Sequence, residues 1–416
     1  MKPTKIISLV AVAALLGWHA SAQNYDTNGD YVQTFAGSGF SGYLDGVGQL
    51  TMFNYPNAIV ADSSSNLFVL DSGNYRIRKI APDGTVSTFA GGGGGGLPGY
   101  GTNVSLFSSF GSMTIDHSNA LWIISGFSLL RIGSNAYVSN IVLNGLSGSS
   151  GVCVDSGNNI YYSTYNGNQI YRWRTNGVLE LFAGSGNSGA IDGNGIFTSF
   201  SNPSALAADA ADNIYVWDSG NNLIRRIDQS RNVTTLAGIF NHSSNADGVG
   251  TNATFYGISS MCSDNAGNIY IALGLGGSPG SYIRKMNAQT NVVTMAGSFT
   301  QTGYTNGAGK LARFGGAQGV CISGGTIYVA DSSNQRIRSI TNNPQPQTVS
   351  GANLGIGTFA GITITGLVGR TYQIQTSPDM NAWTTRATLL LTSSPYLWID
   401  QNPVSGNKFY RALLLP

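Results

Sequence analysis

The sequence predicts an all-β protein in which six similar sheets close into a ring, a six-bladed β-propeller, followed by a small β-sandwich-like domain. Three observations lead to this fold class. A block recurs six times in one register, a strand-ending motif precedes the first block, and the composition is rich in glycine but poor in charge. Repeated units of short strands stack against their copies and can close into a ring.

Each copy of the block starts with a Phe or Leu that is followed nine residues later by an Asp, or once by a Ser. An apolar–aromatic strand core comes four or five residues further on. The six pairs are Phe53/Asp62, Phe107/Asp116, Leu146/Asp155, Phe200/Asp209, Phe255/Asp264 and Phe314/Ser323. Because the register is constant, we expect one supersecondary unit stacked against its own copies.

The first block predicts four short antiparallel strands, at residues 57–61, 67–70, 76–80 and 86–90. Turn-forming residues separate them at 62–66, at 71–74 and at Pro82-Asp83-Gly84. Short strands at this spacing, with Asp, Ser, Asn and Gly between them, are typical of a β-meander.

A Phe-Ala-Gly motif ends the fourth strand of most copies, and Val142 to Gly145 is a degenerate version. The motif also occurs at Phe35-Ala36-Gly37, ahead of the first block, whereas the last block ends at Ile340 without a fourth strand. We therefore expect Tyr31 to Ala36 to complete the last blade and close the ring, which removes the exposed sheet edges.

The first 22 residues have the pattern of a secretory signal peptide. Lys2 and Lys5 precede an apolar run from Ile6 to Trp18, and Ala20-Ser21-Ala22 fits a cleavage site after Ala22. Without Lys2 and Lys5 the basic and acidic residues are equal in number. The sequence thus predicts a secreted, periplasmic or cell-surface protein, with neither a nucleic-acid partner nor membrane insertion.

The run Asn66 to Ile80, partly repeated at Asp331 to Ile340, resembles the core of the NHL-repeat β-propellers. With its Phe-Ala-Gly and Asp-Gly-x-Gly motifs, the longer unit is similar to secreted bacterial and teneurin-like members. The resemblance covers about residues 31–340 and implies the fold. The second and third blocks differ, because Ser125 and Ser163 stand near the position of Asp71, Asp218 and Asp331.

Beyond the repeats, residues 341–348 contain Pro344 and Pro346 and are predicted to be a linker. Residues 349–416 are predicted to form the small β-sandwich-like module. The run Tyr372 to Trp383 resembles a module that ends exported proteins of planctomycete- and verrucomicrobium-type bacteria.

Long connections between the blades and the second-to-third strand turns are predicted to share one face of the ring, where propellers usually bind their ligands. The candidate binding residues on this face are Asp71, Asp218, Asp331, Phe40, Tyr43, Tyr100, Phe240, His242 and Tyr304. The alternative is that the aromatic rings pack the loops onto the blades, and that the three Asp residues only form turns.

Three repeated features have a structural and a functional interpretation. Asp45, Asp192 and Asp247 each precede a Gly and are weak Ca²⁺ candidates, because each loop supplies a single carboxylate. The sequence favours glycine-rich turns in which each Asp caps local N–H groups. Cys153, Cys262 and Cys321 share one inner-strand position, which favours small buried side chains over disulfides. Four third-strand arginines favour pairing within their own blades over an anion-binding ring: Arg78, Arg225, Arg284 and Arg338.

The sequence favours a non-enzymatic binding scaffold for a protein, peptide or glycan, with no cofactor beyond that Ca²⁺ candidate. Only His117 and His242 remain after the leader, so a three-histidine zinc site is excluded within one chain. The alternative is a divalent-metal-dependent lactonase or hydrolase like the gluconolactonase-type six-bladed enzymes. The only Glu, Glu180, is predicted on an outer strand far from their central metal position. A third hypothesis is a structural spacer attached through residues 349–416.

Overall fold

A computed structural model describes residues 29–106, 110–125, 128–141, 149–274, 280–342, 361–364, 368–378, 381–392, 396–399 and 409–415. The predicted signal peptide, the degenerate motif at 142–145 and most of the predicted linker lie outside these residues. The chain divides into two compact units at Gln345/Pro346. None of the described helices is long and apolar enough to cross a bilayer.

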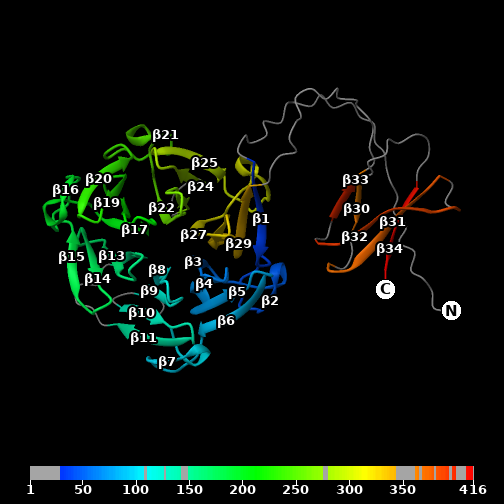
Figure 1. Cartoon of the computed structure of the whole chain (residues 1–416), viewed down its shortest axis with the longest axis horizontal. Helices are drawn as coiled ribbons and strands as arrows, with labels where there is room; N and C mark the ends of the chain where they lie inside the picture. The colour runs from blue at the N-terminus through cyan, green and yellow to red at the C-terminus, as the bar shows by residue number, and fades with distance from the viewer. Residues whose placement is uncertain are drawn as a thin grey trace. The chain divides into compact units, whose positions relative to one another are not determined.

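The described part of the first unit forms six antiparallel sheets, which we number as blades 1 to 6 in chain order (Figure 1). The strand named first in each blade is the innermost one. Blade 1 contains β3 (Pro56–Ala61), β4 (Leu67–Asp71), β5 (Arg76–Ile80), β6 (Thr85–Gly91) and, outermost, β2 (Gly46–Val47). Blade 2 contains β8 (Phe110–Ile115), β9 (Leu121–Ser125), β10 (Ser128–Ile132), β11 (Tyr137–Ile141) and β7 (Gly99–Tyr100). Blade 3 contains β12 (Ser149–Val154), β13 (Ile160–Thr164), β14 (Gln169–Trp173) and β15 (Leu179–Ala183).

The other three blades repeat this order. Blade 4 contains β17 (Pro203–Ala208), β18 (Ile214–Asp218), β19 (Leu223–Ile227), β20 (Asn232–Ala237) and β16 (Gly193–Asn194). Blade 5 contains β22 (Ile258–Ser263), β23 (Ile269–Leu273), β24 (Ser281–Met286), β25 (Asn291–Ser298) and β21 (Gly248–Val249). Blade 6 contains β27 (Ala317–Ser323), β28 (Thr326–Asp331), β29 (Arg336–Asn342), β1 (Asp30–Ala36) and β26 (Gly307–Ala308).

The predicted all-β propeller is confirmed, and the N-terminal strand closes it. β1 pairs antiparallel with β29 over most of its length, so the strand at the start of the repeats completes the sheet at their end (Figure 1). One feature was not predicted. Within the described residues, five blades carry a fifth, two-residue outer strand, which the long connections form as they pass between blades. Each of these short strands pairs with two residues of the strand beside it and so covers part of that sheet edge.

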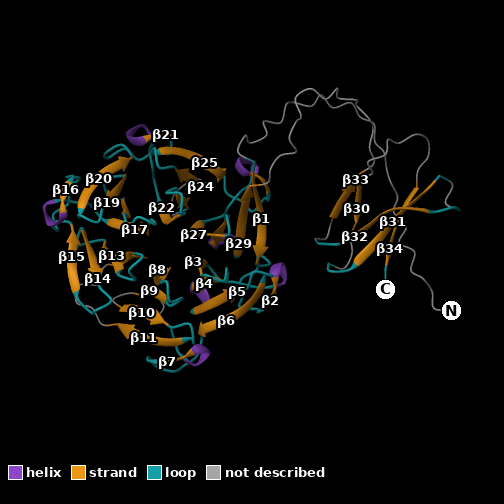
Figure 2. Ribbon diagram, in the orientation of Figure 1, coloured by secondary structure: helices purple, strands orange, loops and turns teal. Residues whose placement is uncertain are grey.

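Short 3₁₀ turns occur within these connections and at two of the second-to-third strand turns (Figure 2). They are η1 (Gly48–Leu50), η2 (Ser72–Asn74), η3 (Gly101–Asn103), η4 (Gly195–Phe197), η5 (Gly250–Asn252), η6 (Gly309–Leu311) and η7 (Ser332–Asn334).

The repeated residues have definite structural roles. The block Asp caps the first turn: Asp62 Oδ1 accepts hydrogen bonds from the Ser64 and Asn66 N–H groups, at 2.9 and 2.8 Å. The Gly of the Phe-Ala-Gly motif is required by its backbone, because a Cβ on Gly37 (φ +97°) would lie 2.4 Å from a carbonyl oxygen. The block Phe is fully buried in all four blades where it is described: Phe53, Phe200, Phe255 and Phe314.

The second unit is a small β domain described here by itself. β31 (Thr371–Ser377) lies between β32 (Thr384–Leu390) and β34 (Phe409–Leu414), and β30 (Gly361–Ile364) pairs with β33 (Tyr396–Ile399). Its described core is centred on Tyr372, Ile374 and Leu391.

Candidate binding face

A buried ion-pair network fixes the long connections to their blades. In blade 1 the Arg78 side chain is fully buried and its guanidinium contacts Asp71 Oδ2 at 2.9 Å and Asp45 Oδ1 at 2.6 Å. The same guanidinium donates to the backbone carbonyls of Met52 and Leu44. One cation therefore joins the end of β4, at Asp71, to two separate points of the connection at 38–52, at Leu44-Asp45 and at Met52.

Arg78 also lies over the buried block Phe, with Cζ 5.2 Å from the Phe53 ring centroid. This arrangement recurs with small changes in three other blades. Blade 4 repeats it with Arg225, Asp218 and Asp192; blade 6 with Arg338, Asp331 and Asn306; and blade 5 with Arg284 and Asp247. The predicted pairing of these arginines is confirmed, and each of the four also lies near the ring of its block Phe.

Two sets of predicted site residues need correction. Asp71, Asp218 and Asp331 are fully buried, so their carboxylates cannot contact a ligand on the surface. Burial raises the pKa of each carboxyl, to about 6 in Asp218, although hydrogen bonds and the neighbouring guanidinium oppose this shift. Their role is to hold the buried arginines.

Asp45, Asp192 and Asp247 are not arranged as calcium ligands. Asp45 Oδ2 accepts from the Thr88 N–H at 3.1 Å while Oδ1 binds Arg78, and the other two carboxylates repeat this pattern with their own Arg and Thr. Their oxygens are already engaged by donors, whereas Ca²⁺ requires six to eight oxygen ligands. In the described residues no group of three or more His, Cys, Asp and Glu side chains is placed to hold a metal.

The predicted sharing of one face is confirmed by hydrogen bonds between the turns and the connections. Asn74 Nδ2 donates to Gly42 O, and Asn221 and Asn334 make the equivalent bonds to Gly189 and Gly303. We call the surface formed by these turns and by the parts of the connections that contact them the loop face; the two-residue outer strands and the 3₁₀ turns that follow them form the rim. Because its loops are fixed at several points, side chains on it are held by a rigid support.

The aromatic side chains of the loop face are largely exposed to solvent, although some of them, such as Tyr43 and Phe299, also contact residues of the blades. Nine of them are between 42% and 72% exposed in the described residues: Phe40, Tyr43, Tyr55, Tyr75, Tyr165, Phe240, Tyr256, Phe299 and Tyr304. His242 is exposed in the same connection as Phe240. Five of these aromatics were not predicted from the sequence: Tyr55, Tyr75, Tyr165, Tyr256 and Phe299. Tyr75 directly follows the turn at 71–74 that was assigned to this face.

Tyr100 has a different location from the one predicted. It lies on β7 and pairs with Tyr137 of β11, and the centroids of the two rings are 4.7 Å apart. Because β7 is the outermost strand of blade 2, Tyr100 belongs to the outer edge of that sheet and not to the loop face. Exposed apolar residues also occur in the 3₁₀ turns beside these outer strands, among them Leu50 and Phe197.

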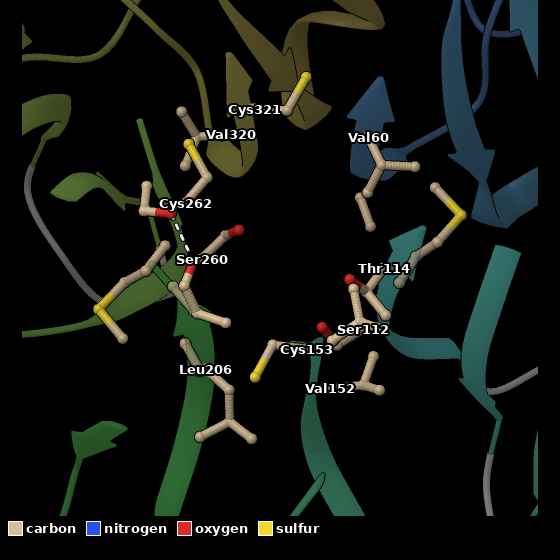
Figure 3. A pocket seen from close by; sticks show the side chains of 18 of the residues that line it. Val60, Ser112, Thr114, Val152, Cys153, Leu206, Ser260, Cys262, Val320 and Cys321 are labelled. Atoms are coloured by element: carbon tan, nitrogen blue, oxygen red, sulfur yellow. Dashed lines mark hydrogen bonds between the residues drawn. The ribbon is translucent and has the colours of Figure 1, made fainter. Parts of the chain in front are cut away.

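A cavity of about 680 Å³ runs between the six inner strands, β3, β8, β12, β17, β22 and β27. Its lining is largely neutral, with Ser112, Thr114 and Ser260 beside aliphatic groups (Figure 3). All three cysteines line it and are free thiols. Burial raises the pKa of each thiol, so the thiols remain protonated and unreactive at neutral pH, as expected for structural cysteines.

Glu180 lies on β15, an outer strand of blade 3, as predicted. It forms ion pairs with Arg172 and Arg174 of its own blade and with Arg231 of blade 4. Burial opposes its ionisation, but the hydrogen bonds and charges of Arg174 and Arg172 outweigh burial and lower its pKa to about 2. Glu180 therefore joins two blades at the outside of the ring, where it cannot take part in a central metal site.

Comparison with known proteins agrees with this geometry. Residues 314–338, which include the buried Phe, Asp and Arg of blade 6, match the family model of the NHL repeat. The propeller carries an NHL repeat. The chain is 27% identical over 324 residues to the protein SUPPRESSOR OF QUENCHING 1, chloroplastic, of Arabidopsis thaliana. That match covers 74% of this chain but only 27% of the plant protein, so the chain spans about a quarter of its length.

Two solved structures from Bacteroides thetaiotaomicron share the fold. One is a structural genomics protein of unknown function, with 20% identity and a TM-score of 0.60 over 75% of this chain and 76% of that one. The other is an auxiliary nutrient binding protein, with 17% identity and a TM-score of 0.59 over 75% of this chain and 76% of that one. At these identities the likeness concerns the fold alone.

Proposed function

We propose that this protein is an exported, non-enzymatic binding protein that holds a glycan on the loop face of its propeller. The observation that carries the proposal is the set of exposed aromatic rings on loops that buried ion pairs fix in place. Exposed apolar groups gathered on one face mark an interaction site. A rigid support lowers the entropy lost when the ligand binds.

A glycan fits this face better than a peptide does. Peptides commonly add a strand to an open sheet edge, but in five blades part of the outer edge is already paired with a two-residue strand, which shortens the stretch open to a peptide. Many backbone groups of the connections are also bonded internally, as in Ser38 N to Thr51 O and Gly42 N to Phe53 O. The ring faces remain as the main contact groups, and the C–H groups of a sugar pack well against an aromatic face.

Two further points support the proposal. The basic, apolar and small-residue pattern of the first 22 residues suggests export, which would bring the loop face into contact with external polysaccharides. A fold relative is described as an auxiliary nutrient binding protein, an activity compatible with glycan capture. The hydrolase alternative gains no support, because the described channel lining offers Asp209 as its only carboxylate.

The proposal is tested by affinity gel electrophoresis of the purified chain in gels that contain neutral or acidic polysaccharides. We expect at least one polysaccharide to retard the protein. The loop-face variant Phe40→Ser/Tyr75→Asn/Phe240→Ser should lose most of that retardation. The rim variant Leu50→Ser/Phe197→Ser, which removes apolar groups that are even more exposed, should keep it. Absence of retardation by every polysaccharide, or an equal loss in the rim variant, would overturn the proposal.

A further inference from the structure

Two Tyr–Arg pairs occupy equivalent places on the loop face in neighbouring blades. In blade 1, Arg76 Cζ lies 4.6 Å from the centroid of the Tyr43 ring. In blade 6, Arg336 Cζ lies 5.0 Å from the centroid of the Tyr304 ring. Each Tyr stands two residues before the residue that binds the buried arginine, Asp45 or Asn306, and each Arg begins the third strand of its blade.

The two blades meet at the closure of the ring, so the pairs belong to one region. The Tyr55 N–H donates to Gln335 Oε1 at 2.6 Å, and Arg336 Nη2 donates to Ser38 O at 2.9 Å. Both bonds cross from blade 6 to the connection that leads into blade 1. We name Tyr43, Tyr55, Tyr75, Tyr304, Arg76 and Arg336 the closure patch.

The fold does not require the Tyr–Arg pairs. Blade 4 has the same buried Arg and Asp as blade 1, but Ala190 and Leu223 stand at the Tyr43 and Arg76 positions. Blade 5 has Asn245 and Tyr282 there. Tyr and Arg are thus present together or absent together, which indicates that they serve something other than blade architecture.

The backbone supplies a second sign of function in blade 1. Tyr55 and Tyr75 have left-handed backbone conformations, with φ of 51° and 55°. At the equivalent positions of blade 4 the residues are Asn202 and Asn222, which tolerate that conformation better. A Tyr held at such a position costs stability, and residues of this kind gather at functional sites.

The charge of the closure patch is positive and uncompensated. Arg76 and Arg336 have no carboxylate partner in the described residues, whereas the buried Arg78 beside them has two. The Arg76 Nε atom is also buried without a hydrogen-bond partner there. Each guanidinium is half-buried against a Tyr ring, which orders its planar fork and lowers the entropy lost on binding an anion.

We infer that the closure patch binds an acidic polysaccharide built from uronate sugars, a specification that rests on the proposed function. The Tyr faces supply stacking surfaces for the sugar rings, and a guanidinium fork matches a sugar carboxylate in a bidentate geometry. Two such pairs in adjacent blades suit a polymer that repeats the same acidic sugar, because a single polysaccharide chain engages both Tyr–Arg pairs at once.

The test measures binding of the full chain to polygalacturonate and to its fully methyl-esterified form, which has the same sugars without charge. We expect the acidic polymer to bind at least about tenfold more tightly. Arg76→Gln and Arg336→Gln should each weaken binding about tenfold, whereas Lys79→Gln removes a charge from the same strand as Arg76 and should change it by less than about twofold. Circular dichroism and thermal midpoints check that each variant folds.

The outcomes separate the two proposals. Equal binding of the ester, or unchanged binding in both Arg variants, would overturn the acidic specificity and leave glycan binding intact. Binding of poly-glutamate as tight as that of polygalacturonate would assign the patch to acidic peptides and overturn the inference. Failure of every polysaccharide, charged or neutral, would overturn the proposed function itself.

Discussion

Removal of one buried arginine tests how the loop face is held. Arg78→Met keeps the apolar stem but loses the guanidinium, which makes four hydrogen bonds, at 2.6 to 3.1 Å, to Asp71, Asp45, Met52 and Leu44. Asp71 then remains fully buried without its cation. Breaking a buried ion pair from one side costs about 3–5 kcal/mol, so we expect the free energy of unfolding to fall by that amount.

Urea unfolding followed by fluorescence measures this change, and the slopes of the transitions should agree between variants. The neighbouring Lys79→Met is the control, because Lys79 makes no ion pair in the described residues; it should change stability by about 0.5 kcal/mol or less. In the double variant Arg78→Met/Asp71→Asn the orphan charge is gone, so the loss should be smaller than the sum of the single losses by about 1–3 kcal/mol.

Hydrogen exchange adds a local measurement. The amide of Gly42, which donates to Phe53 O, should exchange faster in Arg78→Met because the connection at 38–52 is no longer fixed to its blade. If Arg78→Met lowered the free energy of unfolding by less than about 1 kcal/mol and left hydrogen exchange of the amides at 38–52 unchanged, the ion-pair network would not be what holds the loop face.

Three further predictions concern single residues. Glu180→Gln should lower the free energy of unfolding at pH 7 by about 1–2 kcal/mol, which is less than the ~3 kcal/mol that the lowered pKa implies, because solvent screens the ion pairs. Because the Glu180 pKa is lowered in the folded state, the stability difference between wild type and variant should shrink as the pH falls from 4.5 towards 2. A difference in urea unfolding that does not change with pH would contradict this prediction. The Asp218 carboxyl should titrate near pH 6 by ¹³C NMR. Because its pKa is raised in the folded state, the protonated carboxyl contributes stability below pH 3.8, and this contribution is lost as the pH rises to about 6. A titration below pH 4 would refute the dominance of burial over the neighbouring guanidinium. Tyr75→Asn should raise stability by about 0.5–1 kcal/mol, because Asn suits the left-handed backbone, while it weakens glycan binding; a thermal midpoint below that of wild type would argue against strain at this residue.

The sequence was sufficient for the architecture because the determinants of a blade are local. The spacing from Phe53 to Asp62 sets the inner strand and its capped turn, and the register of the next strand follows within a few residues. The early Phe-Ala-Gly motif also predicted the closing strand, since the last block ends at Ile340 without an outer strand of its own. The pairing of Arg78 within its blade was foreseen for the same reason.

The sequence alone did not determine which charges are buried or where the connections run. Arg78 binds Asp71 across one turn but also Asp45, which is distant in sequence and reaches it only because the connection folds back between blades. The same path turns apparent calcium ligands into arginine partners and carries Tyr100 to an outer strand.

The sequence therefore determined the repeats, the ring and the approximate position of the binding loops, which depend on interactions between residues close in the chain. Only the tertiary structure decided that Asp71 is buried while Tyr43 and Tyr304 are exposed, and that Tyr–Arg pairs form in the two neighbouring blades where the ring closes. The physical reason is that burial and charge compensation depend on contacts between distant segments, in this case the first and last blades, which become neighbours only when the ring is complete.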